Sequence, residues 1–145
     1  MLLSAIPALP VADVATAARR YAERFSFQTV HLEAGFALLQ RDQVRITLWQ
    51  AAQRGWQRVG SPPGTSPVRT GAESFLAGTA SCRIQVSDLT GLVAELVASG
   101  ALHPTKPGPE TTEYGTRELH CLDQDGNQLT FFEELPRAGH SHRAV

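Results

Sequence analysis

One pattern occurs twice along the 145 residues of this chain. The tetrapeptide VADV at residues 11–14 returns as VSDL at residues 86–89, 75 residues later, and each copy is followed by a helical spacing of apolar residues. A strand-like segment ends each copy, ITLWQ at 46–50 and LTFFE at 129–133. Each half therefore reads strand–helix–strand–strand–strand, and one such half leaves a sheet face bare. Pairing two halves buries the bare sheet face of each. The sequence therefore predicts an α+β fold of two βαβββ modules whose curved mixed sheets surround a cleft.

The boundaries of the expected elements follow from caps, alternation and turn residues. Asp13 and Asp88 are predicted N-caps, whose carboxylates accept the free amide hydrogens of the first helical turn. Strands are predicted at 3–9, 29–32, 36–40, 44–49 and 79–86, with a final pair inside 113–134 and an irregular stretch at 103–113. Within a single domain, this gives a first module at 1–54, a connection at 55–78, a second module at 79–135 and a disordered tail at 136–145 that includes His140 and His142.

Charge and composition exclude several classes of function. The net charge of −1 gives no general attraction to nucleic acid or to an anionic membrane. No run of about 18 apolar residues is present, so no membrane span is predicted. The apolar start has no basic segment and is broken by Pro7 and Pro10, which favours a strand over a signal peptide. Cys82 and Cys121 lack metal or redox spacing, and we interpret them as buried small hydrophobes of a protein in the reducing cytoplasm.

Three stretches carry a resemblance to a known family. They are RYAERFSF at 20–27, YGTRE at 114–118 and DQDGNQLTFFE at 123–133. Their order and the doubled unit resemble the vicinal oxygen chelate superfamily, and within it the chain is most similar to the glyoxalase/bleomycin-resistance proteins, over roughly residues 3–134. Two turns depart from the family pattern: Ser26 stands where a glycine is usual, and Asp123-Gln124-Asp125-Gly126-Asn127 replaces D-P-x-G-N.

The resemblance also indicates where a metal would bind in this superfamily. Its metalloenzymes use His, Gln or Glu at four strand positions, which correspond here to Ile6, Thr47, Ser81 and Thr130. An aliphatic side chain and three hydroxyls are poor ligands for a divalent ion. Glu133 lies three residues beyond Thr130, an odd step, so it is expected to point away from the pocket face. We therefore expect neither a bound metal nor another cofactor.

A pocket wall is expected instead, because side chains two residues apart share one face of a strand. Aromatic, hydroxyl and guanidinium groups together suit a flat, polar, heteroaromatic ligand. Core packing is the alternative for Phe36 and Phe132, and Arg117 has the alternative of an ion pair with Glu113 or Glu118. Trp56 is expected to cap the cleft or to lie at a subunit interface. The candidate ligand-binding residues are Phe36, Leu38, Thr47, Trp49, Trp56, Ser81, Arg83, Tyr114, Gly115, Arg117, Thr130 and Phe132.

The resemblance implies a function without catalysis. It implies a homodimer that sequesters a cationic small molecule, a bleomycin-type glycopeptide, in two clefts between subunits, and Phe36 and the Tyr114-Gly115 turn match stretches that line those clefts. Two alternatives stay open from the residues. One is a glyoxalase-like or dioxygenase-like enzyme that uses another set of metal ligands, or acid–base chemistry through His120 or Glu118. The other is a ligand-sensing domain with no role in resistance.

Overall fold

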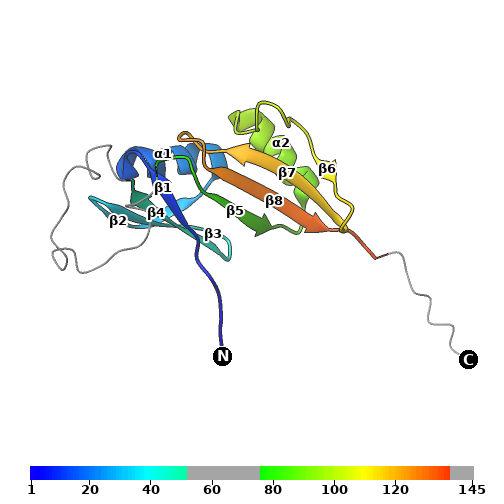
Figure 1. Cartoon of the computed structure of the whole chain (residues 1–145), viewed down its shortest axis with the longest axis horizontal. Helices are drawn as coiled ribbons and strands as arrows, with labels where there is room; N and C mark the ends of the chain where they lie inside the picture. The colour runs from blue at the N-terminus through cyan, green and yellow to red at the C-terminus, as the bar shows by residue number, and fades with distance from the viewer. Residues whose placement is uncertain (52–75, 138–145) are drawn as a thin grey trace, which may run out of the picture.

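The computed structural model describes residues 1–51 and 76–137 (Figure 1). Its elements are, in chain order, β1 (Ala8–Val11), α1 (Val14–Phe25), β2 (Gln28–Glu33), β3 (Phe36–Arg41), β4 (Val44–Gln50), β5 (Ser81–Gln85), α2 (Leu89–Ser99), β6 (Glu110–Thr111), β7 (Thr116–Leu122) and β8 (Gln128–Glu134). The predicted α+β class and the order of elements in both halves are confirmed. Trp56, His140 and His142 lie outside the described residues. The limits given above for the modules, the connection and the tail stay predictions.

The two modules share one sheet topology. Each forms a four-stranded sheet, in the orders β1-β4-β3-β2 and β5-β8-β7-β6, and the two sheets lie side by side in Figure 1. In both sheets the first strand runs parallel to the last, and the other neighbours are antiparallel. The register repeats too, because Ala8 lies opposite Thr47 and Arg83 lies opposite Thr130. The repeat in the sequence is therefore also a repeat of the structure.

Most predicted strand ends shift by one or two residues, and two segments differ more. The strand predicted at 3–9 begins only at Ala8, although the carbonyl of Pro7 already accepts a hydrogen bond from the Thr47 amide at 2.9 Å. Proline has no N–H to donate, so Pro7 and Pro10 suit a strand at the edge of a sheet, and β1 runs past Pro10 to Val11. In the second module, the two-residue strand β6 lies within the stretch predicted to be irregular, where it pairs with β7.

Both helices begin at the predicted caps. Asp13 accepts a hydrogen bond from the Thr16 amide at 2.7 Å, and Asp88 accepts one from the Gly91 amide at 3.0 Å. Ser26 ends α1 in the left-handed conformation, with φ of 57°, where glycine has no steric cost. Its hydroxyl donates to Glu95 on α2 at 2.9 Å, which offsets part of that cost. Neither described helix is long and apolar enough to cross a membrane.

The alternation of side chains gives each sheet two different faces. Ala37 and Leu39 of β3, with Ile46 and Leu48 of β4, are buried and form part of the core that α1 also enters. In the second sheet the corresponding buried residues are Leu119, Cys121, Leu129 and Phe131. Phe25 of α1 contacts Phe131 of β8, with ring centroids 6.2 Å apart, so one core joins both modules. Within the described residues, the helices pack on this face of the sheets, and the residues between these positions lie on the opposite face.

A buried polar network also joins the modules. The Tyr21 hydroxyl of α1 donates to the carboxylate of Asp123 at 2.8 Å, and the Asn127 amide donates to the same carboxylate at 2.9 Å and to the Pro10 carbonyl at 2.8 Å. Burial, followed by the Asp123 charge, raises the pKa of Tyr21 well above its usual value, so the phenol stays protonated. Gly78 packs so closely on this turn that an added Cβ would lie 1.9 Å from the Asp125 carbonyl oxygen. The D-Q-D-G-N turn thus fixes the second module to β1 and α1.

This network gives a prediction for stability. Tyr21→Phe removes the donor that joins α1 to the buried Asp123 carboxylate, and we expect the free energy of unfolding to fall by about 1–3 kcal/mol. The measurement is urea unfolding followed by circular dichroism at one protein concentration. Arg20→Gln on the same helix is the matched control: its ion pair with Glu23 is exposed, and its removal should change stability by less than about 0.5 kcal/mol. Equal effects of the two substitutions would contradict the role given to Tyr21.

Candidate functional site

The face of the first sheet opposite α1, here called face A, carries four of the predicted residues. Phe36 and Leu38 of β3 and Thr47 and Trp49 of β4 are all partly exposed, as their alternation with buried neighbours requires. Phe36 lies opposite Trp49, and their rings are 4.7 Å apart at 58°. The Trp49 indole donates to the Thr47 hydroxyl at 3.2 Å, and that hydroxyl donates to the Pro7 carbonyl at 2.9 Å. Face A is therefore an aromatic surface whose side chains are held by neighbours.

The corresponding face of the second sheet, face B, carries four more predicted residues. Ser81 and Arg83 of β5 are exposed, Phe132 of β8 is partly exposed, and Thr130 is buried beneath them. The guanidinium carbon of Arg83 lies 4.5 Å from the centroid of the Phe132 ring, in cation–π geometry. Face B thus combines an aromatic ring with a cation.

Glu118 of β7 anchors this cation. Its side chain is 3% exposed and accepts hydrogen bonds from both terminal nitrogens of Arg83, at 2.9 and 2.7 Å. The Thr116 hydroxyl donates to the same carboxylate at 2.6 Å and the Tyr114 hydroxyl at 3.0 Å. Arg83 first, and then these hydroxyls, lower the pKa of Glu118 to about 2 despite its burial. Glu118 is therefore a fixed negative charge at neutral pH.

Tyr114 and Gly115 form the turn that leads into β7. Tyr114 is 69% exposed, and only its hydroxyl is held, by Glu118. Gly115 has φ of 85°, a conformation in which a side chain would be strained, and its carbonyl accepts a hydrogen bond from the Leu135 amide at 2.9 Å. The turn therefore presents an aromatic side chain at the rim of face B.

Arg117 lies on the other side of the sheet, so its predicted place on the cleft face is wrong. Its guanidinium donates to the Thr90 hydroxyl at 3.1 Å and to Glu133 at 3.3 Å, on the side that α2 covers. Its partner is Glu133, not Glu113 or Glu118, because Arg117 and Glu133 are opposite each other in the β7–β8 register. The prediction that Glu133 points away from the pocket face is confirmed, since its carboxylate also accepts from the Leu89 amide of α2 at 3.2 Å.

Known proteins resemble this chain in sequence and in structure. No family model matches it. A bleomycin resistance protein of Geobacillus stearothermophilus and one of Staphylococcus aureus are each 41% identical over 134 residues, which cover 92% of this chain and 98% of the relative. The chain belongs to the bleomycin resistance protein family. Its fold agrees with that of a bleomycin resistance determinant encoded on transposon Tn5, with a TM-score of 0.66 and 24% identity over 92% of this chain and 98% of that one. It also agrees with that of a bleomycin-binding protein complexed with bleomycin, with a TM-score of 0.64 and 25% identity over 92% and 99%.

Four positions of this chain correspond to the metal ligands of the superfamily's metalloenzymes. In this member of the bleomycin resistance family, the side chains at these positions do not form a set of metal ligands. Ile6 lies before β1, Thr47 is hydrogen-bonded to the Pro7 carbonyl, and Thr130 is 5% exposed beside His120. The residues opposite the two threonines are Ala8 and Arg83, neither of which is a metal ligand. Across residues 1–51 and 76–137, no group of three or more His, Cys, Asp or Glu side chains is placed to hold an ion.

Hydrogen bonds to neighbouring side chains hold the His120 ring in place. Its Nδ1 lies 3.2 Å from the Thr130 hydroxyl and 3.0 Å from the Gln128 amide nitrogen, which fixes the ring within face B. Burial is the first cause that lowers the pKa of His120, so the ring is neutral at physiological pH. Burial also raises the pKa of Cys82 to about 11 and that of Cys121 to about 12, so neither thiol is an activated nucleophile.

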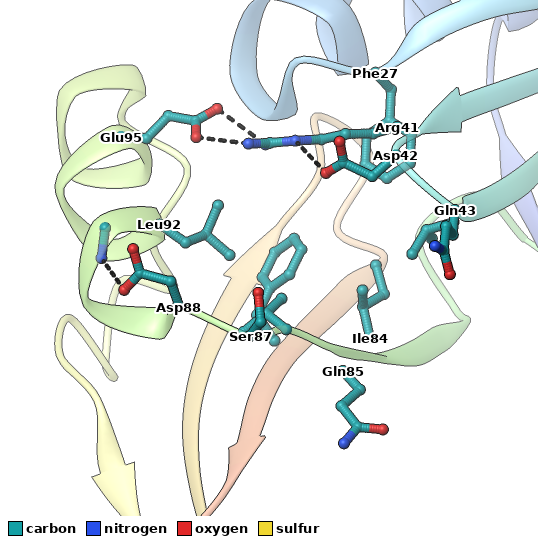
Figure 2. Close-up of a pocket in the computed structure, with 14 residues that line it drawn as sticks. Phe27, Arg41, Asp42, Gln43, Ile84, Gln85, Ser87, Asp88, Leu92 and Glu95 are labelled. Atoms are coloured by element: carbon teal, nitrogen blue, oxygen red, sulfur yellow. Dashed lines mark hydrogen bonds and ion pairs between the residues drawn. The ribbon is translucent and has the colours of Figure 1, made fainter.

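A groove of about 650 Å³ lies elsewhere, between the β3–β4 turn and the start of α2 (Figure 2). Polar and apolar side chains both line it, and across its top in Figure 2 runs the ion pair of Arg41 with Glu95, whose atoms approach to 2.8 Å. None of the predicted ligand-binding residues that the structure describes lines it. Sequence reasoning missed the groove because its lining comes from both modules, from residues such as Arg41 and Glu95 that lie far apart in the sequence. The apolar residues that line it include Phe27, Ile84, Leu92 and Phe131.

The lowered pKa of Glu118 predicts a pH dependence of stability. A carboxyl with a folded pKa of about 2 and a usual value of 4.5 stabilises the fold fully above about pH 4.5, and this contribution is lost as the pH falls toward 2. Glu118→Gln should lower the free energy of unfolding by about 1–3 kcal/mol at pH 7. The difference from the wild type should shrink markedly by about pH 3, measured by urea unfolding across this range. A difference that stays constant down to pH 3 would contradict the assigned ionisation.

Proposed function

We propose that this protein binds and sequesters a bleomycin-type glycopeptide on faces A and B. The supporting observation is the aromatic pair Phe36–Trp49, partly exposed on a sheet face that the chain's own helices do not cover within the described residues. Such a pair offers stacking surface to a flat heteroaromatic ligand, worth about 0.5–1.5 kcal/mol for each aromatic contact beyond area burial. The relatives named bleomycin resistance proteins, and the complex of a similar fold with bleomycin, support this ligand class.

Sequestration rather than catalysis agrees with the chemistry of both faces. His120 is held by Thr130 and Gln128, and the Glu118 charge is satisfied by four hydrogen bonds. The carboxylate therefore has no free capacity to transfer a proton near neutral pH. We propose that the protein acts without a metal or cofactor of its own, and its two free cysteines support a reducing compartment, which we assign as the cytoplasm.

We further propose a homodimer, with ligand clefts that form between two copies. A single sheet face gives one wall, whereas binding sites commonly bury most of a small ligand. The chain also exposes apolar side chains that a second copy would cover: Met1, Leu2 and Leu3 are almost fully exposed, and Val30 and Leu32 of edge strand β2 are 56% and 50% exposed. An apolar arm and an open sheet edge are typical of surfaces buried by association.

The dimer is tested by its mass. Multi-angle light scattering at micromolar concentration should give about twice the 15.7 kDa of one chain. Deletion of residues 1–6 should shift the mass toward the monomer, because it removes the exposed apolar arm. A monomer mass for the intact chain would refute the dimer and with it the two-wall cleft.

The function is tested by titration with metal-free bleomycin. We expect the wild type to bind with quenching of tryptophan fluorescence, and Trp49→Ala to bind about tenfold more weakly because it removes the stacking surface. Calorimetry gives the affinity of the variant, whose fluorescence differs. Val97→Ala, on the exposed side of α2, is the matched control and should bind like the wild type. Absence of binding to the wild type, together with no protection of bacteria that express it, would refute the proposed function.

A further inference from the structure

Three of the ion-paired arginines, Arg41, Arg83 and Arg117, differ in how their donors are used. Arg41 donates to both oxygens of Glu95 and also to the Phe25 carbonyl, and Arg117 donates to Thr90 as well as to Glu133. Arg83 donates only to Glu118 among the hydrogen bonds of the described residues. A guanidinium has five N–H donors, and within the described residues Glu118 accepts from two terminal nitrogens of Arg83, with the Tyr114 hydroxyl close by, so further donors are left for another acceptor. Glu118 therefore holds the Arg83 guanidinium in place without using all of its N–H donors.

The geometry also fixes the direction in which the free donors point. Glu118 grips both terminal nitrogens, and the Phe132 ring supports one face of the guanidinium at 4.5 Å from its centroid. The Arg83 side chain is nevertheless 47% exposed, whereas Glu118 is 3% exposed. The other face and the outer edge of the guanidinium are therefore the parts left open on face B. A planar cation held in this way is preorganised and loses little side-chain entropy when a further partner binds.

We propose that Arg83 is a specificity-determining residue that recognises a planar, acceptor-bearing group of the ligand, such as a heteroaromatic carboxamide, by stacking and in-plane hydrogen bonds. Glu118 is its positioning residue, which acts through Arg83 and does not touch the ligand. The inference rests on the proposed function, because it assigns to face B the acceptor-rich part of the same ligand.

The first test is calorimetric titration of metal-free bleomycin into Arg83 variants. Arg83→Lys keeps the charge but loses the planar fork, and we expect about tenfold weaker binding. Arg117→Lys is the matched control on the opposite face of the same sheet, and its affinity should stay within about twofold of the wild type. Wild-type affinity in both Arg83→Lys and Arg83→Gln, when the wild type binds, would overturn the proposal while leaving the proposed function intact.

A double-mutant cycle shows whether Glu118 positions Arg83 for the ligand or only stabilises the folded protein. Glu118→Gln should weaken binding about fivefold in the wild-type background, because Arg83 is no longer held, and should have no effect on binding in the Arg83→Gln background. A merely structural role would lower the melting temperature in both backgrounds and leave the affinities unchanged or additive. Additive losses would therefore refute the positioning role of Glu118.

A small probe tests the site independently of the drug. Picolinamide, a heteroaromatic carboxamide, should shift the amide signals of β5 and of the Tyr114-Gly115 turn in nitrogen-15 spectra of the wild type but not of Arg83→Gln. If bleomycin does not bind but picolinamide gives these shifts, the proposed function fails and the assignment of Arg83 stands. If picolinamide gives no shifts at millimolar concentration, or gives the same shifts with Arg83→Gln, the assignment of Arg83 fails.

Discussion

Each helix can cover only one face of its four-stranded sheet, and the period-two alternation of strand side chains divides every strand between a covered and an open side. The covered sides supply one core shared by both modules, through contacts such as Phe25 with Phe131. The open sides keep Phe36, Trp49 and Phe132 partly exposed. The same alternation that stabilises the fold therefore also presents the surface for a ligand.

Two buried carboxylates have contrasting roles in this arrangement. Asp123 lies on the seam between modules, where Tyr21 and Asn127 satisfy it and its partners are all internal. Glu118 is equally buried, but its main partner Arg83 reaches the open face. Replacing Asp123 or its partners is expected to affect the fold as a whole, whereas changes at Glu118 also alter a surface available to other molecules. The burial of a carboxylate therefore does not by itself indicate its role. The exposure of its partner indicates whether the carboxylate acts only on the fold or also on a surface.

The sequence predicted the repeat, both helix caps and most of face A, because these depend on local spacing and on alternation along one strand. It misplaced Arg117, since the face of β7 depends on its pairing with β8 about the turn at 123–127, which puts Arg117 opposite Glu133. It also gave no indication of the Arg83–Glu118 pair or of the groove beside Arg41, because both require contacts between residues more than 30 positions apart. Long-range pairing, rather than local propensity, is the information that was lacking.

A crystal structure of the protein with metal-free bleomycin would show whether the drug lies on the open faces of the sheets or in the groove between the β3–β4 turn and α2. We expect the drug to lie against Trp49 and Phe36, with an acceptor-bearing planar group over Arg83 and with the groove unchanged. Drug bound in the groove beneath the Arg41–Glu95 pair, with faces A and B free, would contradict it.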